Sequence, residues 1–195
     1  MRHRSALVFS AGLGAALVGG WFAFPLALYS RAEQPLQFSH RVHSGEKVGL
    51  ACEECHAVSE GGRFSGIPGI EKCATCHAEA QGSSRDEKRL VEEYVKKGRE
   101  IPWLAYSRQP ENVYFPHAPH LKLAGLKCER CHGPHGRSDT LRPFEQDRIS
   151  TYSRDIGGRS FARLGGAEAA SMTMDDCSRC HRERGVRESC LSCHK

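Results

Sequence analysis

Residues 52–56 read Cys-Glu-Glu-Cys-His, and this Cys-x-x-Cys-His pattern decides how the chain folds. The pattern recurs until it has used all ten cysteines of the 195-residue chain. In chain order, motifs 1 to 5 occupy residues 52–56, 73–77, 128–132, 177–181 and 190–194. Because no cysteine is left over and every pair is followed by histidine, the sequence describes one kind of site that is built five times.

Each motif has the residues that attach a haem. Two cysteines at this spacing add to the two vinyl groups of one haem, and the adjacent histidine becomes an axial ligand of the iron. The expected attachment residues are Cys52, Cys55, Cys73, Cys76, Cys128, Cys131, Cys177, Cys180, Cys190 and Cys193. The expected proximal ligands are His56, His77, His132, His181 and His194. The sequence therefore predicts five covalently bound haem c groups.

Paired cysteines also build zinc sites, disulfides and redox dithiols. With 11 histidines in 195 residues, the chance that five pairs are all followed by histidine is roughly one in a million, which decides between a motif and coincidence. A zinc ribbon needs no histidine at that position, and a disulfide scaffold needs no uniform spacing. The haem interpretation is therefore favoured.

The haems limit the fold class. Residues 33–195 provide only about 33 residues for each haem, too few for a conventional apolar core around every cofactor. We expect a mostly α fold with extensive loops and little or no sheet, in which haem faces form most of the core. The formal charge of +5 does not indicate nucleic acid, because haem propionates would pair with many of the basic side chains.

The amino-terminal segment is apolar. Residues Ser5 to Ser30 have no charged side chain and follow Arg2 and Arg4, so the segment is long enough to span a bilayer, with its amino terminus in the cytoplasm. We expect residues 1–32 to be an uncleaved anchor in the cytoplasmic membrane and residues 33–195 to be a periplasmic pentahaem domain. A cleaved signal peptide is the alternative, although Ser30-Arg31-Ala32 is a poor cleavage site.

Two similar segments precede motifs 1 and 3. We call them module A, which is Phe38 with His40 and His43, and module B, which is Phe115 with His117 and His120. Both read as an aromatic residue and two histidines three apart, a short distance before a haem motif, which indicates an internal repeat. We expect these four histidines to be distal iron ligands.

Further ligand candidates are weaker. His135 lies three residues after His132, so it cannot reach the opposite face of the same haem and would serve another. Met172 and Met174 precede motif 4 and compete with His135 as distal-ligand candidates, since thioether ligation raises a haem's potential relative to imidazole. Packing against a haem face is the alternative role of these methionines. Residues 133–176 have no haem motif and are expected to be a docking arm on a partner or a mobile loop.

A helix is expected after motif 2. Ser84 with Glu87 three residues later forms a capping box, and Leu90, Val91, Tyr94 and Val95 mark one helix face, which Gly98 ends.

The modules resemble class III cytochromes, and the wider pattern resembles one family. Its features are the anchor, both modules, Gly66-Ile67-Pro68, Ile101-Pro102-Trp103, Val113-Tyr114-Phe115 and Met172-Thr173-Met174. In this order they are similar to the membrane-anchored multihaem cytochrome subunit shared by the menaquinone reductase of sulfate reducers (the Qrc type) and alternative complex III.

The resemblance implies a non-catalytic electron-transfer subunit within a respiratory complex. The implied partners are an integral quinone-binding subunit, a molybdopterin-oxidoreductase-like subunit, iron–sulfur subunits and a soluble periplasmic multihaem cytochrome. In the Qrc type electrons reach menaquinone; in alternative complex III they flow from quinol to a periplasmic acceptor. A small membrane-anchored quinol dehydrogenase is a further alternative. A sixth haem, if the family has one, would need a non-standard attachment in this chain.

Overall fold

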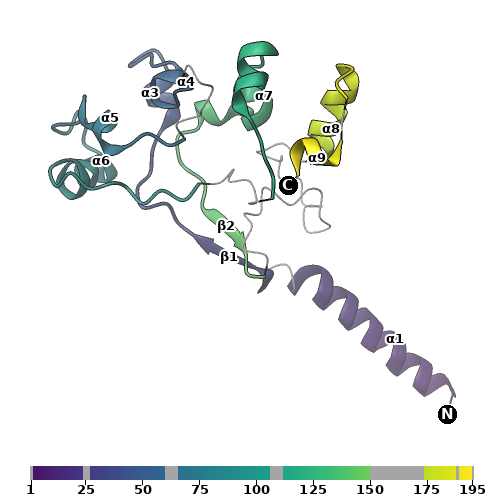
Figure 1. Ribbon diagram of the computed structural model, residues 1–195. Helices are drawn as coiled ribbons and strands as arrows, with labels where there is room; N and C mark the ends of the chain where they lie inside the picture. Colours follow the sequence, from purple (N-terminus) through teal and green to yellow (C-terminus); the bar gives the residue numbers. More distant parts are fainter. Residues whose placement is uncertain are drawn as a thin grey trace.

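The computed structural model of the chain describes residues 2–23, 27–59, 66–105, 112–149, 174–187 and 189–194. Figure 1 shows one straight helix, α1, that projects from a group of short helices joined by long connections. This arrangement agrees with the expected mostly α fold with extensive loops.

Helix α1 spans Arg2–Val18 and continues into a wider turn at Gly19–Ala23. The stretch Arg4–Ala23 has a mean hydropathy of 1.7, and none of it is buried against the rest of the chain. By length and composition this helix can cross a membrane, and an amino-terminal signal sequence would have the same properties. The structure therefore agrees with an apolar amino-terminal helix of the length that an anchor needs.

Most helices are a single turn or little more, because glycines, prolines and haem motifs follow one another closely. The short α-helices are α3 (His40–Ser44), α4 (Cys52–Cys55), α5 (Ile70–Ala74), α6 (Arg85–Arg89), α7 (Glu129–His132), α8 (Met174–Glu183) and α9 (Cys190–Cys193). Wider or tighter helical turns are η2 (Leu90–Val95), η3 (Pro119–Leu123) and η4 (Gly133–Arg137). Each haem motif overlaps one of the α-helices.

A small sheet joins the segment after α1 to the expected arm. Strand β1 (Tyr29–Ala32) pairs antiparallel with β2 (Phe144–Asp147), with Tyr29 opposite Asp147. At the start of the arm, the Ser44 hydroxyl donates to the Gly136 carbonyl at 2.7 Å, and the Arg41 backbone N–H donates to the Ser138 carbonyl at 3.1 Å. The first part of the arm thus packs on its own chain, whereas residues 150–173 lie outside the described residues.

The aliphatic core lies beside motif 2. Leu36, Ile70, Tyr94 and Ile101 form a buried cluster against which Cys73 packs. Ile70 belongs to α5 and Tyr94 to η2, so the helix expected after motif 2 covers that motif. Its amino-terminal cap, Ser84, and its terminating residue, Gly98 at φ +58°, are as expected.

Shortening Ile101 to alanine is expected to destabilise the haem-loaded protein by about 2–5 kcal/mol, because it removes buried methyl groups and leaves a cavity. Ile101 is 7% exposed. Leu123→Ala is the matched control, because Leu123 is 86% exposed and its change should stay within about 0.5 kcal/mol. Thermal unfolding of both variants measures the difference, and equal losses would show that the cluster does not act as a core.

Candidate haem-binding sites

Each haem motif folds as one helical turn. The backbone N–H of the histidine donates to the backbone carbonyl of the first cysteine. The N–O distances are 2.8 Å in motif 1, 2.9 Å in motif 2, 3.0 Å in motif 3 and 2.8 Å in motif 5. Motif 4 lies inside α8. The local fold therefore brings both cysteines and the histidine of each motif together, as attachment of one haem requires.

The cysteines form no disulfide with one another. Among the described residues, no three histidine, cysteine or acidic side chains converge as a metal site. Burial raises the pKa of the Cys73, Cys128, Cys131 and Cys177 thiols.

Modules A and B have nearly the same geometry. In module A, the Phe38 ring stacks on the His43 ring, with ring centroids 4.2 Å apart and an interplanar angle of 18°. The same phenyl ring meets His40 edge-on, with centroids 4.9 Å apart and an interplanar angle of 81°. In module B, Phe115 stacks on His120 at 4.6 Å and 25° and meets His117 edge-on at 4.9 Å and 89°. The internal repeat expected from the sequence is therefore also a structural repeat.

The second histidine of each module is oriented by its own backbone. His43 Nδ1 lies 2.8 Å from the Ser39 carbonyl oxygen, and His120 Nδ1 lies 2.8 Å from the Pro116 carbonyl oxygen. A carbonyl only accepts hydrogen bonds, so Nδ1 must carry the proton. Nε2 is left with its lone pair, which is the atom that a metal binds, and the ring orientation is fixed before any metal arrives.

Two pairs of rings have the spacing that an iron atom needs. The ring centroids of His43 and His77 lie 6.1 Å apart, and those of His120 and His181 also lie 6.1 Å apart. Two metal–nitrogen bonds of about 2 Å each, together with the distance from each nitrogen to its ring centre, require a separation of about 6 Å. These pairs therefore fit two axial imidazoles of one haem.

The pairs connect distant parts of the chain. Module A precedes motif 1, yet its His43 faces His77 of motif 2. Module B precedes motif 3, yet its His120 faces His181 of motif 4. No sequence signal indicated this partition, because spacing along the chain favours neither motif.

The first histidine of each module is in the uncharged, metal-binding form. Burial, aided by His135, His56 and His43, lowers the pKa of His40 to about 4. Burial, aided by His132 and His120, lowers the pKa of His117. At neutral pH both rings are therefore deprotonated, as metal ligation requires. Among the charges that contribute to these two shifts are those of motif histidines, His56 for His40 and His132 for His117.

The weaker candidates do not share this geometry. The ring of His135 lies 4.5 Å from that of His40, which is too close for iron between them. Met174 begins α8 with its side chain 69% exposed, and Met172 lies outside the described residues.

Motifs 1 and 3 border one open cavity of about 510 Å³. Its lining residues are Cys52, Glu53, Ala57, Val58, Leu121, Lys122, Leu126, Lys127, Cys128 and Glu129. The two motifs are also linked electrostatically, since the pKa of His132, lowered chiefly by burial, is lowered further by His56. Motifs that are far apart in sequence are therefore neighbours in space.

Comparisons with known proteins agree with this picture. A sequence model of the class III cytochrome C family matches residues 25–103, a range that includes module A and motifs 1 and 2. The menaquinone reductase multiheme cytochrome c subunit of Nitratidesulfovibrio vulgaris is 41% identical over 200 residues, which cover 97% of this chain and 90% of the relative. The second likeness thus extends over nearly the whole chain.

Proposed function

The chain belongs to the family of the multihaem cytochrome c subunit of menaquinone reductase, and from this premise we propose that it relays electrons between a periplasmic cytochrome and the menaquinone-linked core of such a complex. The identity over 97% of the chain carries the proposal. Bound haem iron supplies the one-electron ferric–ferrous couple. This chain's residues attach, orient and separate the five irons, and the chain is not catalytic alone.

We propose that all ten cysteines attach haem and that the five motif histidines are proximal ligands. The 6.1 Å ring pairs support His43 as distal ligand opposite His77, and His120 opposite His181. The electrostatic action of His56 on His40 and of His132 on His117 supports His40 opposite His56, and His117 opposite His132. His135, Met172 and Met174 remain sequence-based candidates for another sixth ligand.

The contacts between motifs support the spatial order 2–1–3–4–5. Module A links motifs 1 and 2, module B links motifs 3 and 4, and the shared cavity links motifs 1 and 3. Helices α8 and α9, which hold motifs 4 and 5, are neighbours in Figure 1, and Cys193 acts on the thiol of Cys177. Motifs 2 and 5 are then the two ends of the relay.

We propose the location and the partners that the family resemblance implies. The chain is held in the cytoplasmic membrane by α1, with the haem domain in the periplasm. It assembles with an integral quinone-binding subunit and with molybdopterin-oxidoreductase-like and iron–sulfur subunits. A soluble periplasmic multihaem cytochrome supplies the electrons.

Purification of the tagged chain from native membranes in mild detergent tests this assignment. Mass spectrometry is expected to find those subunits with the chain, and the preparation is expected to reduce a menaquinone analogue from a reduced periplasmic cytochrome. Recovery of the chain alone, with quinol oxidation by the isolated subunit, would instead identify a small quinol dehydrogenase.

Replacing residues 1–23 by a cleavable signal peptide, which leaves strand β1 in place, is expected to release a soluble, haem-loaded domain into the periplasm, because the apolar helix is not buried in the rest of the chain. Menaquinone reduction by membranes should fall to background. Cell fractionation with haem staining measures the release. Retention of the truncated chain in membranes at the level of the full chain would show that α1 is not what holds it there.

A further inference from the structure

We propose that Glu87 is a positioning residue that orients His77 and holds the iron of motif 2 at a lower reduction potential than a backbone carbonyl partner would. The inference rests on the proposed function, because it takes His77 to be an iron ligand. It assigns to Glu87 a role that the capping of its helix does not explain.

The two side chains meet in a largely enclosed place. Glu87 Oε1 lies 3.2 Å from His77 Nδ1, and the side chains are 15% and 18% exposed respectively. His77 Nδ1 is sealed from solvent, and in the structure no well-aligned hydrogen bond satisfies it. A buried donor without a partner is costly, so a slight turn of the ring that aligns Nδ1–H with the carboxylate is favoured. His77 Nε2 is then left for the iron.

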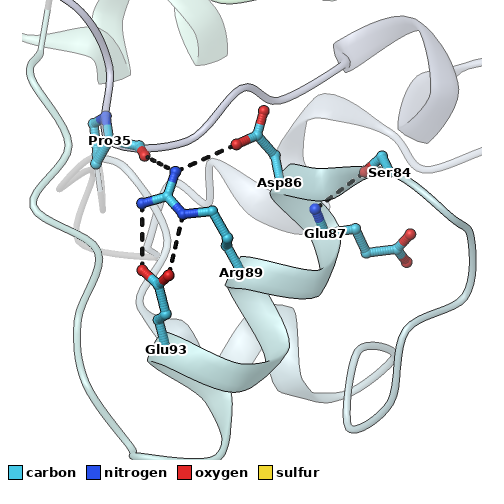
Figure 2. A network of polar contacts seen from close by, with 6 residues as sticks. All are labelled: Pro35, Ser84, Asp86, Glu87, Arg89 and Glu93. Atoms are coloured by element: carbon cyan, nitrogen blue, oxygen red, sulfur yellow. Dashed lines mark hydrogen bonds and ion pairs between the residues drawn. The ribbon is translucent and has the colours of Figure 1, made fainter.

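Glu87 does not complete the capping box that the sequence indicates. The Ser84 hydroxyl accepts from the Glu87 N–H at 3.0 Å, as Figure 2 shows. In a full capping box the glutamate side chain would bind the N–H of the cap residue. Here Glu87 Oε1 accepts instead from the Gln81 N–H at 2.7 Å, which holds the carboxylate against His77.

The charge of Glu87 is not taken up by Arg89, two residues further along the chain. Arg89 donates to Glu93 at 3.2 and 3.3 Å and to the Pro35 carbonyl at 3.1 Å. Figure 2 shows the Glu87 carboxylate pointing away from this network. Gly82 leaves space for it, because a Cβ at that position would lie 2.8 Å from Glu87 Oε2.

Motif 2 differs in this respect from other ligand sites in the chain. His56 Nδ1 lies 2.8 Å from the Gly66 carbonyl oxygen, and His43 and His120 also face backbone carbonyls. A carboxylate partner makes an imidazole a stronger electron donor than a neutral carbonyl does. Stronger donation stabilises ferric over ferrous iron, and the low local dielectric weakens screening of the charge. The potential of the iron in motif 2 is lowered as a result.

The test is a redox titration of the intact haem-loaded chain with Glu87→Gln, which keeps an oxygen acceptor but removes the charge. One of the five midpoint potentials is expected to become more positive while the other four stay unchanged. The electron paramagnetic resonance signal of the same low-spin ferric haem should shift, since it reports ligand donation. Glu93→Gln is the matched control, because it removes the same charge from the same helical segment and should move no midpoint.

Gly82→Ala provides an independent variant in case Glu87→Gln fails to load haem. Its Cβ displaces the carboxylate, so it should shift the same midpoint in the same direction but less. Unchanged midpoints in either well-loaded variant, or an equal shift in Glu93→Gln, would overturn the role of Glu87. A wild-type chain without haem at motif 2 would instead contradict the proposed function, so the two failures are distinguishable.

Discussion

Replacing Cys177 and Cys180 by serine is expected to leave four haems and to divide them into two groups that no longer exchange electrons rapidly. Motif 4 lies between motif 3 and motif 5 in the proposed order. When a reduced periplasmic cytochrome is mixed with the variant, the fast phase should reduce either the three haems of motifs 2, 1 and 3 or the single haem of motif 5. In the wild-type chain all five should be reduced in the fast phase.

Stopped-flow absorbance at the haem bands measures the amplitude of that phase. Cys190→Ser with Cys193→Ser is the matched control, because it also removes one haem but from an end of the order. Its four remaining haems stay contiguous and should be reduced together, or not at all if the donor docks at motif 5. Rapid reduction of all four haems in the motif 4 variant would contradict the order 2–1–3–4–5.

His120→Ala is expected to convert one of the five haems from low spin to high spin, because the iron of motif 4 loses its distal imidazole. The 6.1 Å separation of the His120 and His181 rings predicts this pairing. Electron paramagnetic resonance of the oxidised protein detects the change. In the chain that already lacks Cys177 and Cys180, His120→Ala should add no high-spin signal, since its iron is absent.

His117→Ala is the control for that pairing. It should produce one high-spin haem in both backgrounds, because its neighbour is His132 of motif 3. Comparing each histidine variant with and without motif 4 shows which iron the histidine binds. The effect of the variant disappears when its own motif is removed and persists when a separate motif is removed. A high-spin signal from His120→Ala that persists without motif 4 would show that His120 serves a different iron.

The local chemistry of the sites could be predicted from the sequence. The Cys-x-x-Cys-His spacing predicts the attachment and proximal residues without reference to the rest of the chain, and each motif does fold as one helical turn. Modules A and B were recognisable because two copies of one pattern precede haem motifs. The helix after motif 2 was also predictable, because its boundaries depend on local residues: Ser84 caps its amino-terminal end and Gly98 ends it.

The long-range arrangement could not be predicted. His43 faces motif 2 and His120 faces motif 4, which follows from how loops return in space rather than from spacing along the chain. The pairing of β1 with β2 joins residues more than a hundred positions apart, and neither strand has a strong local signal. Glu87 was correctly assigned to a helix start, but its contact with His77 depends on how motif 2 packs against α6.

We propose that covalently bound porphyrins replace an aliphatic interior in this chain. Thioether-linked haem stays on the polypeptide under denaturing conditions, so intact mass spectrometry of the denatured protein, with pyridine haemochrome absorbance, counts the groups directly. The expected result is the mass of the chain plus five haems and a haemochrome content of five per polypeptide. A mass of the bare chain, or bound zinc with no haemochrome, would contradict it.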